Sequence, residues 1–250
     1  MSIESCCLQG FAWGAEPCGS IGSLADLKTY ITGTSDTAAV LIIHDLFGWE
    51  FRNTRLLADH YAAEAGVTVY VPDFFDGEIL PIQAMLKDEW YKVDVAGFMQ
   101  TNGRKAREPG VFACARVLRD KYKHVGAVGF CYGGWAAFRL GSREHQHSPL
   151  VDCISVGHPS LLAKDDIDQV AVPLQVLAPE HDPAYTAELK AYTFETVTRL
   201  GIPFVYRHFP GVAHGCLVRG EENKPHEREA LVKGKNAVVG WLKEYLHERT

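Results

Sequence analysis

The sequence predicts an α/β protein in which a mostly parallel sheet is flanked by helices. From Val40 onward, short apolar runs alternate with longer segments of helical periodicity, a pattern typical of repeated β–α–β units. Residues 40–43 are Val-Leu-Ile-Ile, and a strand that is apolar at every position suits a sheet covered on both faces. The 250 residues contain no internal repeat and no long linker, so we expect a single domain that spans residues 1–250.

Six strands are predicted from short apolar runs bounded by turn-forming residues. They are Val40–His44, Val67–Val71, Val125–Phe130, Cys153–Val156, Pro173–Ala178 and Phe204–Phe209. The first thirty-five residues are rich in Gly, Ser and Thr and lack strong periodicity, so we expect loops and short strands there.

Five helices are predicted between and after these strands. The first, Thr54–Ala65, places apolar side chains on one face and stops before Gly66, a residue that suits the left-handed conformation at a helix end. The others are Gly110–Lys121, Trp135–Ser142, Ala184–Leu200 and Glu227–Leu246.

Composition and charge exclude several classes of function. Hydrophobic residues make up 47% of the chain and charged residues 22%, which excludes wholesale disorder. There are 25 Lys and Arg residues against 31 Asp and Glu, which gives a net charge of −6. An acidic protein of this kind lacks the positive surface charge that binding to nucleic acid or to an anionic membrane requires. No run approaches the ~18 apolar residues of a membrane span, and the N-terminus lacks a signal-peptide pattern. We therefore expect a cytoplasmic protein, monomeric or homodimeric, whose partner is a small molecule.

Cysteine usage points to a reduced protein. Seven Cys is an odd number, and scattered positions argue against a complete disulfide set. Cys6, Cys7 and Cys18 lie close in sequence, but no His or Cys pair at a zinc-finger spacing completes a metal site, so no metal is expected. Cys114 and Cys153 are expected in the core, and Cys216 in the wall of a site.

The ligand site of such a sheet lies beyond the carboxyl ends of its strands. Several titratable residues follow directly after the predicted strands, and these are His44-Asp45, Asp73, Cys131, His158, the Glu180-His181-Asp182 run and His214. We expect His158 to line the pocket. Five aromatic residues are candidates for the same pocket, although core packing explains such residues equally well: Phe47, Trp49, Phe74, Phe75 and Trp90.

One motif carries the chemistry. Residues 129–134 read Gly-Phe-Cys-Tyr-Gly-Gly, the thiol form of the G-x-S-x-G elbow, between a predicted strand and a predicted helix. Small flanking residues allow a sharp turn, and the helix N-terminus favours a thiolate at Cys131. The Tyr132 N–H then faces a developing oxyanion. A lone Gly-flanked cysteine is more often a small buried side chain, so the interpretation depends on its partners.

The partners follow in the chain order of this elbow, with the nucleophile first, then an acid, then a base. Asp182 follows one predicted strand and His214 the next. Glu180 lies two residues from Asp182 and is the alternative residue to orient the imidazole, and His214 alone is equally compatible with a core histidine. A second oxyanion donor is expected in the loop after the first central strand, at the N–H of Leu46.

These residues carry a resemblance to the dienelactone hydrolase family of α/β-hydrolases, most of all to its fungal and other eukaryotic members. The resemblance runs from Cys6 and Cys7 through the final helix. It is carried by HDLFGWEFRNTRLLADHYA, VYVPDFF, VGFCYGGW, the turn at residues 158–160, APEHD and Ala-His-Gly.

The resemblance implies an α/β-hydrolase fold with Cys131 as nucleophile, His214 as base and Asp182 as its orienting acid. It places Asp45 where bacterial members carry a Glu that interacts with the thiol, and Arg219 near an arginine that binds the substrate carboxylate. The implied activity is hydrolysis of small esters, lactones or thioesters through an acyl-thioenzyme, without a metal or organic cofactor. The alternatives are acyl transfer in a biosynthetic pathway, and non-catalytic binding or thiol sensing on the same fold.

Overall fold

Eight strands form one sheet in the order β1-β2-β4-β3-β5-β6-β7-β8. The computed structural model describes residues 14–87, 89–220 and 224–247. Strands β1 and β2 form an antiparallel hairpin, β2 runs antiparallel to β4, and all other neighbours are parallel. The strands are β1 Ser20–Leu24, β2 Leu27–Thr32, β3 Ala38–Ile43, β4 Thr68–Pro72, β5 His124–Phe130, β6 Cys153–Gly157, β7 Leu174–His181 and β8 Phe204–Ala213.

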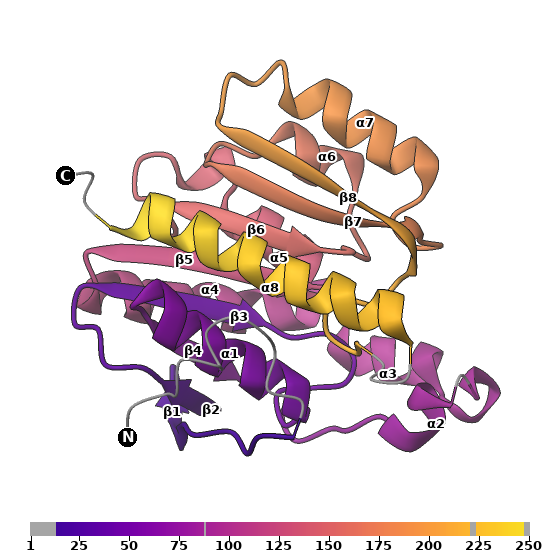
Figure 1. Ribbon diagram of the computed structural model, residues 1–250. Helices are drawn as coiled ribbons and strands as arrows, with labels where there is room; N and C mark the ends of the chain where they lie inside the picture. The colour runs from indigo at the N-terminus through magenta and orange to yellow at the C-terminus, as the bar shows by residue number, and fades with distance from the viewer. Residues whose placement is uncertain (1–13, 88, 221–223, 248–250) are drawn as a thin grey trace.

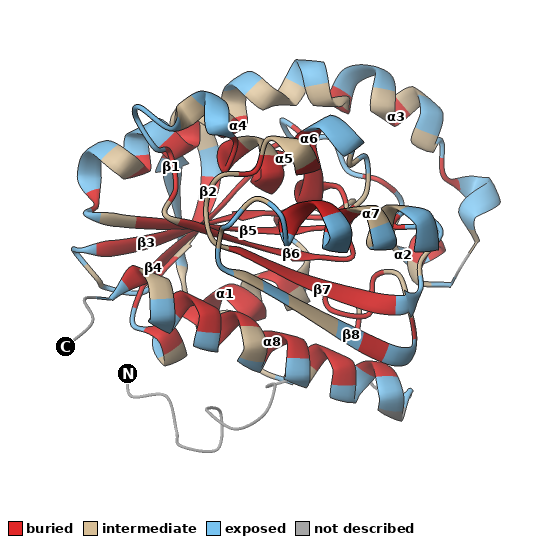
Figure 2. Ribbon diagram, turned by 90° about the horizontal axis from the view of Figure 1, so that it is seen from above, coloured by how far each residue is buried: buried red, intermediate tan, exposed pale blue. Residues whose placement is uncertain are grey.

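Helices cover both faces of this sheet. Helices α1 and α8 lie together on one face, and α4, α5 and α7 lie on the other, as Figures 1 and 2 show. The helices are α1 Arg52–Ala65, α2 Ile82–Leu86, α3 Val95–Asn102, α4 Arg104–Lys121, α5 Gly133–Leu140, α6 Lys164–Asp168, α7 Ala187–Val197 and α8 Pro225–Leu246, with short 3-10 turns η2 Trp90–Lys92 and η3 Arg143–His145. The predicted α/β class is confirmed.

The central strand β3 divides its side chains between two cores. Ala39, Leu41 and Ile43 pack with α4 and α5, whereas Val40 and Ile42 pack with α1 and α8. All six residues of β3 are buried, because successive side chains point to opposite faces and both faces are covered. The continuous apolar run in the sequence has this physical origin.

The predicted elements are found with shifted ends. Helix α4 begins at Arg104, six residues before the predicted start at Gly110. Pro109 lies inside the helix and not at its beginning. Strand β7 extends to His181 and β8 to Ala213, beyond their predicted apolar runs. Helices α2, α3 and α6 were not predicted. Figure 1 shows α2 and α3 projecting at the end of the sheet where β8 ends and α8 begins.

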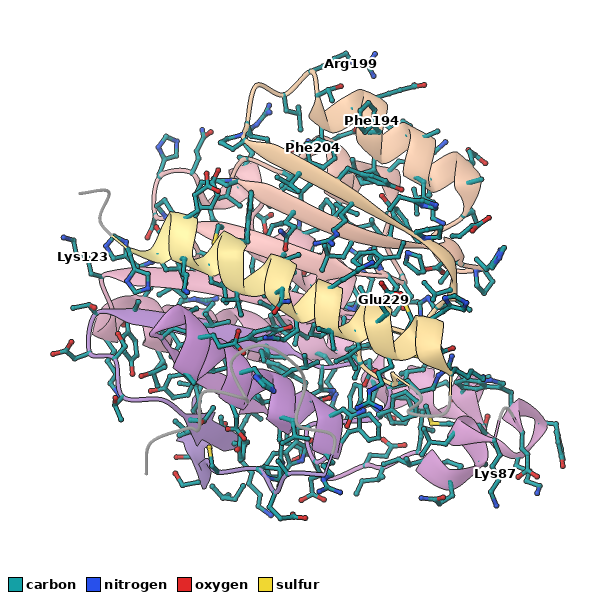
Figure 3. The ribbon with its side chains drawn as sticks, in the orientation of Figure 1. Lys87, Lys123, Phe194, Arg199, Phe204 and Glu229 are labelled. Atoms are coloured by element: carbon teal, nitrogen blue, oxygen red, sulfur yellow. The ribbon has the colours of Figure 1, made fainter. Side chains whose placement is uncertain are left out.

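Strands β7 and β8 form the last pair of the sheet and bring two site residues together. Their register pairs His181 with Ala213, so the residues that follow them in sequence emerge side by side. Helix α7 packs against this pair through an aromatic contact between Phe194 of α7 and Phe204 of β8, whose ring centroids lie 6.0 Å apart (Figure 3). Phe194 itself is half exposed.

Candidate active site

The turn between β5 and α5 holds Cys131 in a strained conformation. Cys131 has a φ of +48°, which non-glycine residues rarely adopt. The turn is possible because glycines flank it on both sides. A side chain at Gly133 would overlap the carbonyl oxygen of Ile43, and one at Gly129 would overlap the carbonyl of Gly133. The Gly-x-Cys-x-Gly spacing is therefore a steric requirement, and it presents the partly exposed thiol at the N-terminus of α5.

Three side chains from the ends of β5, β7 and β8 meet at this thiol. The Nε2 atom of His214 lies 3.0 Å from Sγ of Cys131, and its Nδ1 atom lies 2.8 Å from Oδ1 of Asp182. The same Asp182 oxygen accepts hydrogen bonds from the backbone N–H groups of Ala184 and Tyr185. The Asp182 side chain is wholly buried, whereas that of His214 is 23% exposed. The imidazole is thus held from one side and contacts sulfur on the other.

Glu180, the alternative partner for the imidazole, lies elsewhere. Its carboxylate is exposed and accepts a hydrogen bond of 2.7 Å from the backbone N–H of Gly211. The structure thus brings Asp182, and not Glu180, to His214.

The charges of the cluster stabilise a protonated imidazole. Burial lowers the pKa of His214, but the charge on Cys131 and the hydrogen bonds to Asp182 and Cys131 outweigh it and raise this pKa to about 10. Burial alone would raise the pKa of Asp182, yet the hydrogen bond and charge of His214 bring it below its usual value. The structure therefore favours a protonated His214 at neutral pH, with its Nε2 atom facing the sulfur of Cys131.

Two backbone N–H groups stand beside the thiol. Leu46 lies in the loop after β3 and lines the pocket in front of Cys131, and Tyr132 directly follows Cys131 in the chain. Within the described residues, neither amide donates a hydrogen bond to a protein acceptor. Both predicted oxyanion donors are therefore available to a ligand.

Asp45 lines the same pocket but is buried. Its Oδ1 atom accepts a hydrogen bond of 3.0 Å from the Phe47 N–H. Burial raises the pKa of Asp45 to about 7, partly offset by that hydrogen bond and by the charges of His214 and Arg219. The neighbouring His44 is buried as well, which lowers its pKa to about 4, and it joins the end of β3 to the loop after β4 through the Phe74 N–H.

We expect the free energy of unfolding of the wild type to fall relative to that of Asp45→Asn as pH rises from about 4 to about 7. The folded protein binds the Asp45 proton more tightly than the unfolded chain does, so stability is lost through this window. At ~1.4 kcal/mol per pKa unit, the loss amounts to a few kcal/mol. Urea unfolding at pH 5, 6, 7 and 8 measures it, with the exposed Asp36→Asn as control. Parallel curves for wild type and Asp45→Asn would contradict the prediction.

His158 lies behind the pocket and not in its wall. Its ring is completely buried, with its centroid 4.9 Å from that of His214, and burial followed by the charge of His214 keeps its pKa well below the usual value. Neither ring nitrogen has a partner among the described residues. His158 is not among the residues that line this pocket, and its buried ring packs against that of His214, so the structure does not place it where the prediction expected it.

Two further residues near the thiol, Ser160 and Met85, were not among the predicted site residues. The hydroxyl of Ser160 lies 3.4 Å from the Cys131 sulfur, and the Ser160 N–H donates to the Cys131 carbonyl. Met85 of α2 joins the predicted Trp90 and Phe47 in the wall. The other aromatic candidates, Trp49, Phe74 and Phe75, are buried in the two cores. The turn at residues 158–160 was recognised as a motif, but its contact with the thiol was not predicted, and no local pattern marks Met85 as part of the pocket.

Other candidate features give no second site within the described part of the chain. No group of three or more His, Cys, Asp or Glu side chains in residues 14–87, 89–220 and 224–247 is arranged to hold a metal ion. Cys114, Cys153 and Cys216 are buried, and Cys18 is exposed. Cys6 and Cys7 lie outside the described residues. No helix of the described chain has the length and apolar character that a membrane span requires.

The strand order, the elbow after β5 and the polar residues at the ends of β7 and β8 define a protein of the α/β-hydrolase class. Residues 27–246 match the model of the dienelactone hydrolase family. The chain therefore belongs to the dienelactone hydrolase family, as its sequence motifs predicted, and it is an ester hydrolase.

Individual relatives agree with this assignment. The chain is 30% identical over 255 residues to the hydrolase tropI of Talaromyces stipitatus, with 98% of each chain covered. It is 24% identical to the human carboxymethylenebutenolidase homolog, with 88% of each chain covered. Among solved structures, Thermogutta terrifontis esterase 2 phosphorylated by paraoxon superposes with a TM-score of 0.68 at 16% identity, over 94% of this chain and 98% of the other. That likeness concerns the fold.

Proposed function

We propose that this protein hydrolyses small carboxylic esters, lactones or thioesters with Cys131 as nucleophile, His214 as acid and base, and Asp182 as the residue that orients His214. One observation carries the proposal: both ring nitrogens of His214 are engaged, one 3.0 Å from the sulfur and the other 2.8 Å from the carboxylate. An imidazole held in this way transfers protons at a fixed position.

The reaction begins with the thiolate of Cys131 attacking the carbonyl carbon of the substrate. The carbonyl oxygen becomes an oxyanion, which the N–H groups of Leu46 and Tyr132 stabilise, a contribution of about 3 kcal/mol per donor in other enzymes. His214 gives its proton to the departing alkoxide, enolate or thiolate, and an acyl-thioenzyme remains. The neutral imidazole then takes a proton from water, the resulting hydroxide attacks the thioester carbonyl, and the acid and the thiolate are released.

Brief exposure to an activated aryl ester is expected to leave an acyl adduct on Cys131 that clears with time in water. Intact-protein mass spectrometry follows the adduct, and peptide mapping locates it. Cys216→Ala is the matched control, because this buried cysteine lies two residues from His214 and its replacement leaves the adduct in place.

The other outcomes separate the competing functions. An adduct that forms and never clears in water would overturn hydrolysis in favour of acyl transfer to another acceptor. An adduct on another residue, or none at all, would overturn the assignment of Cys131.

A further inference from the structure

The hydroxyl of Ser160 lies beside the sulfur on which the proposed reaction takes place. Its Oγ atom is 3.4 Å from Sγ of Cys131, within hydrogen-bonding distance of a sulfur atom. Ser160 lines the same pocket as Cys131 and His214, and it is partly exposed. Among the described residues, its hydroxyl has no other hydrogen-bond partner. The sulfur is therefore the group that this oxygen faces.

Backbone hydrogen bonds hold the hydroxyl in this place. The Ser160 N–H donates to the Cys131 carbonyl at 2.8 Å, and the Cys131 N–H donates to the Gly157 carbonyl at 3.0 Å. Pro159 packs so closely on Gly134 that a side chain at Gly134 would overlap the proline ring. Because a single torsion angle separates the Ser160 backbone from its Oγ atom, little further conformational entropy is lost when the hydroxyl meets the sulfur.

His158 fixes the other side of the same turn. Its φ is +37°, which non-glycine residues rarely adopt, and its N–H donates to the Leu177 carbonyl of β7 at 2.9 Å. Its buried ring packs on that of His214. Strained conformations of this kind persist where the surrounding contacts enforce them, and they gather at functional sites. One short turn thus contacts both Cys131 and His214.

Under the proposed mechanism, the Ser160 hydroxyl is the donor in this contact. His214 then holds the transferable proton at its Nε2 atom, 3.0 Å from Sγ of Cys131, and the sulfur is a thiolate between turnovers. An anionic sulfur has no hydrogen to donate, whereas a hydroxyl can donate or accept. Hydrogen bonds to a charged atom are roughly twice as strong as those between neutral groups.

A donor at the sulfur has opposite effects on the two halves of the reaction. In acylation the sulfur gives up its charge to form the C–S bond, so a hydrogen bond that stabilises the thiolate weakens it as a nucleophile. In deacylation His214 takes a proton from water, the hydroxide attacks the thioester carbonyl, the C–S bond breaks and its electron pair returns to sulfur. The hydrogen bond now stabilises the charge that develops there, and Ser160 keeps its own proton throughout.

We infer that Ser160 is a catalytic residue of this site, whose hydroxyl donates a hydrogen bond to the Cys131 sulfur and speeds the release of the acyl group. The inference rests on the proposed function and adds a residue to its machinery. A hydrolase needs this second half-reaction, since every turnover requires the free sulfur to be regenerated.

Ser160→Ala tests the inference through two rate constants that are measured separately. With enzyme in excess over 4-nitrophenyl acetate, release of nitrophenolate gives the rate of acylation, and acid quenching with intact-protein mass spectrometry gives the decay of the adduct. We expect deacylation to slow by about 10-fold or more, the size expected of one hydrogen bond to a charged atom, while acylation is unchanged or faster. Ser148→Ala is the matched control. Ser148 is exposed and is not among the residues that line the pocket, so its replacement leaves both rate constants unchanged.

The outcomes separate this inference from the proposed function. A wild type that forms no adduct on Cys131 would overturn the proposed function, and the inference with it. Equal decay of the adduct in wild type and Ser160→Ala, or a parallel loss in both rate constants, would overturn the role of Ser160 and leave hydrolysis intact.

A second pair of variants decides the matter if the alanine variant fails to fold. Ser160→Thr and Ser160→Val introduce side chains of nearly equal shape, of which Thr alone retains the hydroxyl. We expect the adduct of Ser160→Thr to clear at least ~10-fold faster than that of Ser160→Val, and equal clearance would overturn the inference.

Discussion

Cys131→Ala is expected to reduce kcat/KM for an ester substrate by about 10⁴-fold or more, to the level of background hydrolysis. Removing a nucleophile eliminates the covalent route entirely, and the losses measured for single members of comparable triads are of this size. The oxyanion donors and the pocket remain, so the variant still binds ester without cleaving it. A continuous assay at neutral pH, with the variant at high concentration, measures the residual rate.

The fold is expected to survive this substitution. Alanine retains the Cβ of Cys131 and introduces no new group into the turn. The melting temperature of the Cys131→Ala variant should therefore stay close to that of the wild type. Cys18→Ala, which removes an exposed thiol outside the pocket, is the matched control and keeps full activity. If Cys131→Ala retains turnover, another group must be the nucleophile, even if the acyl adduct is lost from the variant.

Gly133→Ala is expected to lower the free energy of unfolding by about 3 kcal/mol or more and to abolish activity. The added methyl group would overlap the carbonyl oxygen of Ile43, a backbone atom at the end of β3 that has no room to move. Relief requires α5 to shift away from β3, and that shift displaces Cys131 from His214 and from the Leu46 N–H. Urea unfolding gives the stability, and the ester assay gives the activity.

Gly240→Ala provides the comparison for this variant. Gly240 lies inside α8, is exposed, and has no atom within 4 Å of an added methyl group. Alanine there gains helix propensity, and we expect stability to rise by up to ~1 kcal/mol. A similar gain in stability at Gly133 would contradict the predicted overlap with the Ile43 carbonyl.

The parts of the molecule that sequence predicts well are those in which local chemistry dictates structure. The uninterrupted apolar run of β3 is stable only in the middle of a sheet that is covered on both faces. The glycines around Cys131 permit a tight turn that other residues would block by steric overlap. Asp182 and His214 were placed by the rule that parallel strands end at one edge, and the pairing of His181 with Ala213 brings them together.

What the sequence did not predict depends on contacts between distant segments. Helices α2 and α3 are short, and α2 is defined by packing around the pocket and not by a strong periodicity. Ser160 reaches the thiol across 29 residues of sequence; its turn was recognised as a motif, but the contact itself was not predicted. His158 follows a strand, as pocket residues do, yet its ring turns inward and packs on His214.

The position of His214 near the end of the chain has a consequence for synthesis. His214 is made 83 residues after Cys131, and it reaches the sulfur only when β8 has paired with β7. A nascent or truncated polypeptide that stops before β8 therefore lacks the imidazole that contacts the Cys131 sulfur. Under the proposed mechanism, the catalytic cluster is therefore complete only once the last strand of the sheet has been synthesised and has paired with its neighbour.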